Sequence, residues 1–127
     1  MSFILLSQKA LQHNISVIAK KAPLERVYAV LKDNAYGHGL VEFGGLCARL
    51  GMRHAVARDS KEARQIAHLF ESVLVLSEIA DFDAPENVEF AVNAIQTIKL
   101  IPHGKKVHLG VDSGMHRNGV AIADIPN

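Results

Sequence analysis

The sequence predicts an α/β protein built on a parallel β-sheet, and three observations support this. Short apolar runs rich in β-branched residues alternate with amphipathic segments of helical periodicity along the whole chain. The segments between successive runs are long enough to cross over a sheet, so consecutive strands are expected to lie parallel. No linker, low-complexity tract or block of like charge interrupts the alternation. We therefore expect one continuous domain over the 127 residues.

Five apolar runs are expected to form the strands. The first, residues 27–31, is apolar throughout, which is typical of a strand buried on both faces. Residues 54–57, 73–76 and 107–111 are expected to form the second, third and fifth strands, and residues 88–92 a weaker fourth. The last run would lie at the edge of the sheet, where an apolar strand invites association.

Helices are expected between these runs. The first begins after Ser7, a favourable N-cap, and Pro23 stops it. Gly51 ends the second helix, and Asp59 with Glu62 resembles a capping box at the start of the third. The second helix is expected to carry Leu40, Phe43, Cys47 and Leu50 on one face, and the fourth is expected from Asn93.

Composition and charge narrow the class of protein. Hydrophobic residues make up 49% and charged residues 21%, as in soluble globular domains. The net charge is only +1, so we expect neither nucleic acid nor a membrane as partner. The single cysteine, Cys47, fits the helical core, and no segment has the layout of a signal peptide or the length of a membrane span. These features favour a cytoplasmic protein.

Two architectures fit the alternation of strands and helices, an open doubly wound sheet and a (β/α)8 barrel. Periodicity does not separate them. A complete barrel needs about 250 residues, so this chain is long enough for only about half of one. Length favours the open sheet, and only sequence motifs reverse that preference.

Lys32 follows the first predicted strand directly. The carboxyl edge of a parallel sheet is where ligands bind and reactive residues gather. An amine partly desolvated beside the apolar run would be a good nucleophile for a Schiff base with an aldehyde. Most lysines that end a strand are only solvated end caps, so the surrounding residues must decide.

The residues around Lys32 form an ordered motif. Residues 29–39 read Ala-Val-Leu-Lys-Asp-Asn-Ala-Tyr-Gly-His-Gly, and this segment resembles the cofactor-lysine motif of alanine racemases. Residues 107–120, with Val-Asp-Ser-Gly-Met, are similar to a second block of that family. The two motifs stand in the family's order, so the resemblance extends over essentially the whole chain.

The resemblance implies a fold and an activity. The fold would be the amino-terminal portion of a (β/α)8 barrel with about five of the eight strands. The activity would be the interconversion of L- and D-alanine with pyridoxal 5'-phosphate, which supplies D-alanine for peptidoglycan. The full-length enzyme would be a homodimer.

The resemblance also implies roles for three residues. Lys32 would bind pyridoxal phosphate covalently and act as one of two acid–base groups. Tyr36 would give its hydroxyl to the cofactor phosphate, although it equally fits a half-buried ring with a backbone partner. Arg117 would lie near the cofactor's phenolic oxygen and the substrate carboxylate, although a surface role on a glycine-rich turn suits it too. No metal is expected, because the seven histidines lack metal-ligand spacing.

The sequence departs from the family pattern at three points. Asp33 stands where the family usually has alanine, next to the lysine. Gly110 stands where many members have a lysine that braces the arginine equivalent to Arg117. The chain ends at Asn127, just past the fifth predicted strand. The opposite-face tyrosine and the carboxy-terminal β-domain of the family come later.

Racemisation needs an acid–base group on each face of the Cα, and Lys32 supplies only one. We therefore expect residues 1–127 to be a partial barrel domain, truncated before the β-domain and without useful racemase activity alone. Two alternatives stay open. One is a serine or broad-specificity amino-acid racemase, and the other is a non-catalytic pyridoxal-phosphate-binding protein of related fold, which would share the lysine but not the Ala35–Gly39 continuation.

Overall fold

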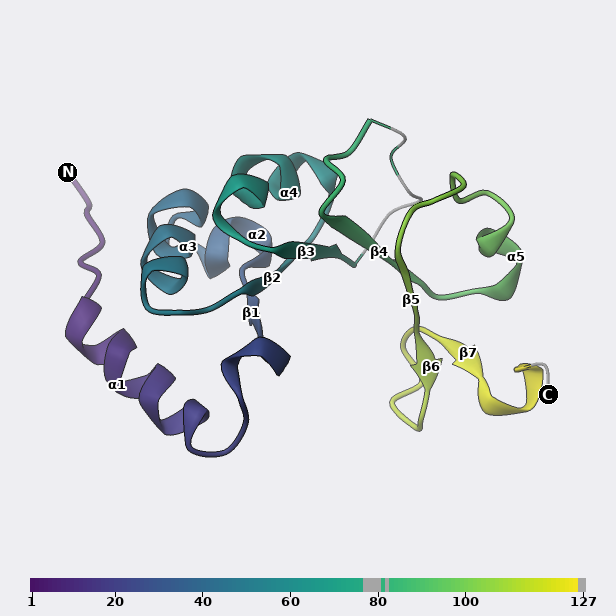
Figure 1. Ribbon diagram of the computed structural model, residues 1–127, viewed down its shortest axis with the longest axis horizontal. Coiled ribbons are helices and arrows are strands. Elements are labelled where there is room, and N and C mark those ends of the chain that lie inside the picture. The colour runs from purple at the N-terminus through teal and green to yellow at the C-terminus, as the bar shows by residue number, and fades with distance from the viewer. Residues whose placement is uncertain (77–80, 82, 126–127) are drawn as a thin grey trace.

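The five expected strands form one parallel sheet (Figure 1). The structure is a computed structural model that describes residues 1–76, 81 and 83–125. The strands are β1 (Tyr28–Val30), β2 (His54–Ala57), β3 (Ser72–Val75), β4 (Val88–Val92) and β5 (Val107–Leu109). All neighbouring pairs are parallel, and strand order follows chain order. Sequential order of this kind is that of a (β/α)8 barrel, so the barrel portion is confirmed and the open doubly wound sheet is not.

Four α-helices match the four that the sequence predicts: α1 (Gln8–Ala19) before β1, and α3 (Leu40–Arg49), α4 (Ser60–Ile66) and α5 (Ile95–Ile98) between strands. The short α2 (Lys32–Tyr36) after β1 was not predicted. The Ser7 hydroxyl accepts a hydrogen bond from the Ala10 N–H at 3.2 Å, which confirms the first N-cap. Gly51, with φ +97°, follows α3 as predicted. No helix of the described residues is both long and apolar enough to cross a membrane.

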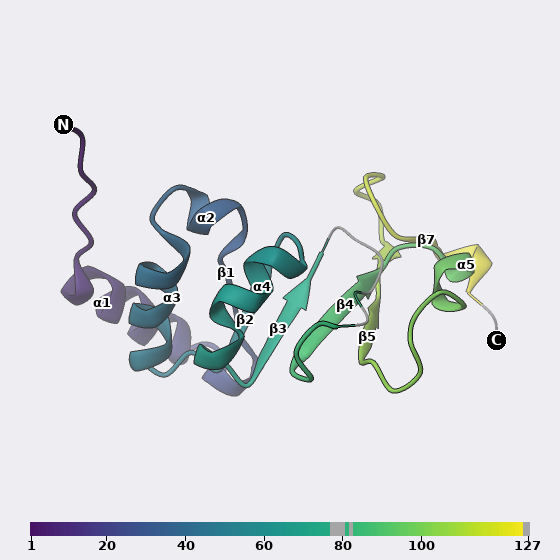
Figure 2. The same ribbon diagram turned by 90° about the horizontal axis from the view of Figure 1, so that it is seen from above.

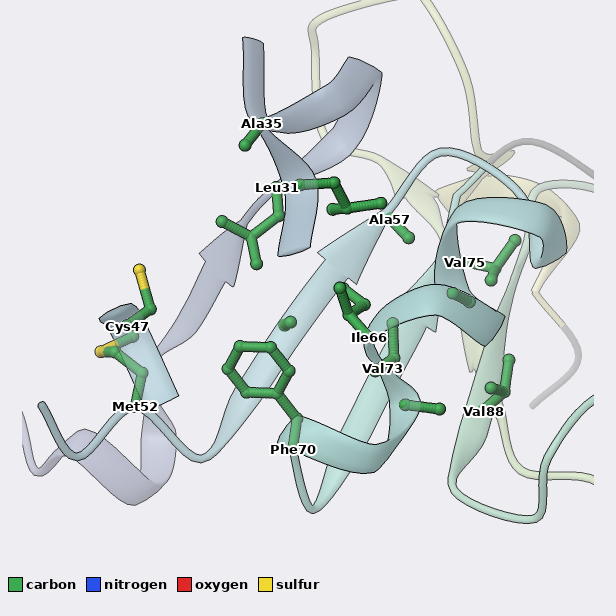
Figure 3. Packing of buried hydrophobic residues seen from close by; sticks show 14 of the residues in the cluster. Leu31, Ala35, Cys47, Met52, Ala57, Ile66, Phe70, Val73, Val75 and Val88 are labelled. Atoms are coloured by element: carbon green, nitrogen blue, oxygen red, sulfur yellow. The ribbon is translucent and has the colours of Figure 1, made fainter. Parts of the chain in front are cut away.

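The hydrophobic core lies between the sheet and helices α3 and α4 (Figures 1 and 3). Alternate strand residues such as Ala57, Val73 and Val75 are fully buried on this face, where Ile66 meets them. Cys47 is 3% exposed within the same cluster, and burial raises the pKa of its thiol to about 11. The prediction that this cysteine belongs to the core is therefore confirmed.

The opposite face of the sheet carries a group of polar side chains near the amino ends of the strands. The Tyr28 and His54 rings stack with centroids 4.9 Å apart, and His54 Nδ1 lies 2.9 Å from the Ser72 hydroxyl. Glu89 lies 2.7 Å from Nε2 of His108. We call these five residues the polar layer. It lies at the end of the strands away from Lys32.

The two edges of the sheet are open in the described structure. The expectation that the first strand is buried on both faces is wrong, because β1 is an edge strand and Val30 is 47% exposed. The expected apolar edge at β5 is confirmed, with Val107 41% and Leu109 39% exposed. The predicted fifth run is divided at Gly110, after which β6 (Val111–Asp112) pairs with β7 (Val120–Ala121).

Candidate active site

Lys32 stands where the chain leaves the carboxyl end of β1. The residue before it, Leu31, is 1% exposed, and its N–H donates to the Val56 carbonyl at 2.8 Å. This bond extends the pairing of β1 with β2 up to the lysine. Lys32 itself is half-buried. The core therefore fixes the backbone immediately before Lys32.

The backbone after Lys32 turns in the left-handed sense. Asp33, Asn34, Ala35 and Tyr36 have φ angles of 55°, 56°, 52° and 54°, and Gly37 continues the turn with φ 87°. Left-handed helical geometry costs an L-residue about 1–2 kcal/mol, and ordinarily only single residues adopt it. We call residues 32–36 (α2) the Lys32 turn. Such strain persists only where surrounding contacts over-determine the conformation.

A carboxylate from α4 holds this turn. The Glu62 oxygens accept hydrogen bonds from the backbone N–H groups of Asn34 at 2.9 Å and Asp33 at 3.2 Å. They also accept the Arg58 N–H at 2.9 Å, and Glu62 is only 8% exposed. Hydrogen bonds to an ionised acceptor are stronger than neutral ones. The Glu62 carboxylate therefore joins α4 and the end of β2 to the Lys32 turn.

The predicted capping box at the start of α4 is present in a modified form. The Asp59 carboxylate accepts the Glu62 N–H at 2.9 Å, as an N-cap should. That bond holds the pKa of Asp59 below its ordinary value. The Glu62 carboxylate, which in a capping box serves its own helix, serves the Lys32 turn as well. The sequence signal for Glu62 was therefore visible, but it pointed only to a local cap.

The remaining contacts of the Lys32 turn fix its position. The Asn34 side-chain oxygen accepts the Leu40 N–H at the start of α3, at 2.8 Å. Ala35 is 3% exposed and packs into the core (Figure 3). Tyr36, by contrast, is 61% exposed, so the interpretation of its ring as half-buried is wrong. The ring is accessible at the edge where a ligand would bind.

The unusual carboxylate beside Lys32 has a partner. Arg58 Nη1 donates to the Asp33 carboxylate at 2.9 Å, and Nη2 of the same guanidinium donates to Asp59 at 3.0 Å. The hydrogen bonds to Asp59 and then Asp33 raise the pKa of Arg58. The Asp33 charge is thus partly balanced by Arg58, which comes directly after β2.

Arg117 lies in the loop between β6 and β7, and we call residues 113–119 the Arg117 loop. One Asp112 oxygen accepts the N–H groups of Gly114 and His116, both at 3.0 Å. These N–H groups hold the pKa of Asp112 below its ordinary value. Arg117 itself is exposed. The loop is therefore shaped by its own aspartate, whose carboxylate accepts backbone N–H groups further along the chain as in an Asx turn.

Two glycines explain how the chain enters and leaves this loop. A Cβ at Gly110 would lie 2.5 Å from the side-chain oxygen of Asn93, which thus fills the space that a side chain at this position would need. Gly119 has φ 112°, and a Cβ there would lie 2.7 Å from the Asp112 backbone nitrogen. Only glycine fits such a close backbone approach.

The structure brings two of the three predicted site residues together. Lys32 and Tyr36 share one turn after β1, whereas the Arg117 loop is reached from the opposite edge strand, β5. Figure 2 shows α2 and the Arg117 loop beyond the same, carboxyl-terminal edge of the sheet. An amine, a phenol and a guanidinium at this edge suit an aldehyde, a phosphate and an oxygen anion. The donor chemistry therefore fits pyridoxal phosphate.

A parallel sheet in sequential order, with a lysine directly after its first strand, defines the class: the amino-terminal portion of a (β/α)8 barrel with a lysine at its ligand-binding edge. A sequence profile described as "Alanine racemase, N-terminal domain" matches residues 6–127. The chain therefore belongs to the alanine racemase N-terminal domain family.

Individual relatives agree with this assignment. The alanine racemase of Nitratiruptor sp. is 44% identical over 126 residues, which are 98% of this chain and 37% of the relative. The solved histidine racemase of Leuconostoc mesenteroides subsp. sake matches with a TM-score of 0.76 and 30% identity over 90% of this chain and 34% of that one. Alanine racemase from Bartonella henselae, solved with covalently bound pyridoxal phosphate, has the same fold, with a TM-score of 0.73 and 22% identity over 93% of this chain and 37% of that one. This chain therefore spans little more than a third of each relative.

Proposed function

We propose that this chain is the cofactor-lysine part of a pyridoxal-phosphate-dependent alanine racemase that supplies D-alanine for peptidoglycan. The observation that supports it most is Lys32 at the carboxyl end of β1, directly followed by a braced turn that carries Tyr36. The Nitratiruptor alanine racemase matches 98% of the chain, so the whole described sheet lies within the likeness. The Bartonella henselae enzyme, named with covalently bound pyridoxal phosphate, supports the cofactor.

Each site residue has a defined task in this proposal. The Lys32 amine would hold the cofactor through its aldehyde and, once the substrate amine has displaced it, would move the Cα proton on one face of the substrate. The Tyr36 hydroxyl would donate to the phosphate, and the Arg117 guanidinium would donate to the phenolic oxygen and to the substrate carboxylate. When bound, the cofactor withdraws electrons from the substrate Cα and makes its proton acidic.

The opposite face of the Cα needs a second acid–base group. We propose that this group comes from another part of the enzyme, in a partner subunit of a homodimer. The open edge at β5, with Val107 and Leu109 exposed, supports a larger assembly in which further chain covers this edge. Racemase activity would then belong to that assembly and not to residues 1–127 alone.

Cofactor trapping tests the proposal. The purified chain is incubated with pyridoxal phosphate and reduced with borohydride, and the pyridoxyl adduct is mapped by peptide mass spectrometry. We expect one adduct, on Lys32, which a Lys32→Ala variant loses while a control variant at the exposed Lys61 keeps it. An adduct spread over several surface lysines, unchanged in Lys32→Ala, contradicts the proposal.

A second function is favoured by one specific observation. The histidine racemase of Leuconostoc mesenteroides subsp. sake has the same fold and is 30% identical to this chain. Racemases that act on different amino acids can therefore share this part of the barrel. A serine or broad-specificity racemase remains the alternative. The complete enzyme assayed with alanine, serine and histidine decides, because kcat/KM at least tenfold higher for alanine supports the first proposal.

A further inference from the structure

The Lys32 turn depends on a residue that lies outside both sequence motifs. Glu62, in the first turn of α4, is 8% exposed and accepts backbone N–H groups of Asp33, Asn34 and Arg58. Two of these donors belong to the left-handed turn, and the third belongs to the end of the neighbouring strand. A carboxylate buried in this way stabilises whichever backbone arrangement brings the donors together.

Without this carboxylate, only the Asn34–Leu40 bond, the packing of Ala35 and backbone bonds such as that from the Ala35 N–H to the Leu31 carbonyl would oppose relaxation of the strained turn. Its four residues after Lys32 all carry a Cβ, and each adopts φ between 52° and 56°. The N–H groups of Asp33 and Asn34 would also lose their acceptor. Relaxation toward right-handed geometry would change the direction in which the side chains of Lys32 and Tyr36 leave the backbone.

We propose that Glu62 is the positioning residue for Lys32: its carboxylate holds the strained turn and thereby aims the lysine amine. This role rests on the proposed function only in taking Lys32 as the cofactor lysine. The geometry points to Glu62 because Asp33 and Asn34 bind both of its oxygens, at 3.2 Å and 2.9 Å.

The first test replaces Glu62 by glutamine in the full chain. Glu62→Gln keeps the side-chain size but removes the charge. It also replaces one of the two acceptor oxygens by an NH2 group, which cannot accept a hydrogen bond from the turn. We expect amide hydrogen exchange at Asn34 to accelerate about tenfold or more, because a charge-assisted bond is lost. The share of borohydride-trapped pyridoxal phosphate found on Lys32 should fall several-fold.

The matched control is Glu89→Gln. Glu89 is also buried, at 7% exposure, but it lies in the polar layer and its partners there are His108 and Tyr28. This control should leave exchange at Asn34 and the share of adduct on Lys32 within about twofold of wild type. Equal acceleration in both variants would overturn the proposal, because the effect would then reflect general loss of stability.

A rescue experiment separates positioning from mere support of α4. Asp33→Gly places a residue without Cβ at φ 55°. This removes the steric strain at that position, which the hydrogen bonds to Glu62 otherwise offset. Added to Glu62→Gln, it relieves one of the four strained residues and should recover part of the lost protection at Asn34 and of the trapping at Lys32. Asp33→Ala, which also removes the carboxylate but keeps the Cβ, should recover neither.

The outcomes distinguish the two proposals. Unchanged exchange at Asn34 in Glu62→Gln, or no recovery with Asp33→Gly, overturns the role of Glu62. If the wild-type chain gives no selective adduct on Lys32, the proposed cofactor function fails, while exchange at Asn34 still decides whether Glu62 holds the turn.

Discussion

The Lys32 turn and the Arg117 loop carry the two family motifs, and they are held in different ways. The Lys32 turn is fixed from outside by the buried carboxylate of Glu62 and by Ala35 in the core. The Arg117 loop is held by Asp112, a residue at its own base, and its arginine is exposed. The Lys32 turn is therefore held by residues from other elements of the fold, whereas the Arg117 loop is held only by the residue that precedes it.

The largest effect is expected from a cavity in the core under the Lys32 turn. Ile66 is fully buried, so Ile66→Ala should lower the free energy of unfolding by about 2–5 kcal/mol. Urea unfolding followed by circular dichroism measures this change, and amide exchange should show the Lys32 turn losing protection with the core. If the amides of the Lys32 turn stay protected although the core is destabilised, the turn does not depend on the core.

A smaller and local effect is expected at Gly119. Gly119→Ala places a Cβ 2.7 Å from the Asp112 backbone nitrogen at φ 112°, which should destabilise the β6–β7 pairing by about 1–3 kcal/mol. Exchange of the Val120 N–H, which bonds to the Gly110 carbonyl at 2.8 Å, reports on this pairing. Exchange in the Lys32 turn should stay unchanged. A parallel loss in both regions would show that they are not independent.

The Arg117 loop should also respond to acid, through Asp112. The pKa of folded Asp112 lies below the ordinary value of 3.8, so its contribution is present above that value and is lost as pH falls through the depressed pKa. The protection factors of the Gly114 and His116 amides, corrected for the intrinsic pH dependence of exchange, should therefore decline as the pH falls below 3.8. Asp112→Asn should remove this pH dependence. A decline that persists in Asp112→Asn would assign it to another group.

The smallest effect is expected from the ion pair between Asp33 and Arg58. Both side chains are about half exposed, 46% and 53%, and solvent screens such pairs strongly. Arg58→Met should therefore leave the urea midpoint unchanged within error. Exchange at Asn34 should also stay near wild type, in contrast to Glu62→Gln. Acceleration as large as that of Glu62→Gln would show that the exposed pair, and not the buried carboxylate, holds the turn.

Local sequence signals predicted much of this fold. The Ser7 cap, the Gly51 terminator and the strands at β2 and β4 follow from residue type and spacing, and the structure confirms them. The resemblance to alanine racemases then decided between barrel and open sheet, because periodicity is the same in both.

Features that depend on distant contacts escaped prediction. Asp33 to Tyr36 have no intrinsic preference for a left-handed turn, and their acceptor Glu62 lies 28 residues beyond Asn34 in the chain. The exposure of Val30 follows from the edge position of β1, which an apolar run does not reveal. The separation of the Arg117 loop from the Lys32 turn is likewise a matter of sheet order.

The central claim is that the Lys32 turn forms a selective lysine site without help from the Arg117 loop. The direct measurement is the fraction of borohydride-trapped pyridoxal phosphate on Lys32 in the wild-type chain and in Arg117→Ala. We predict the same selective adduct on Lys32 in both. Loss of the selectivity in Arg117→Ala would contradict the claim, since the two regions would then have to act together.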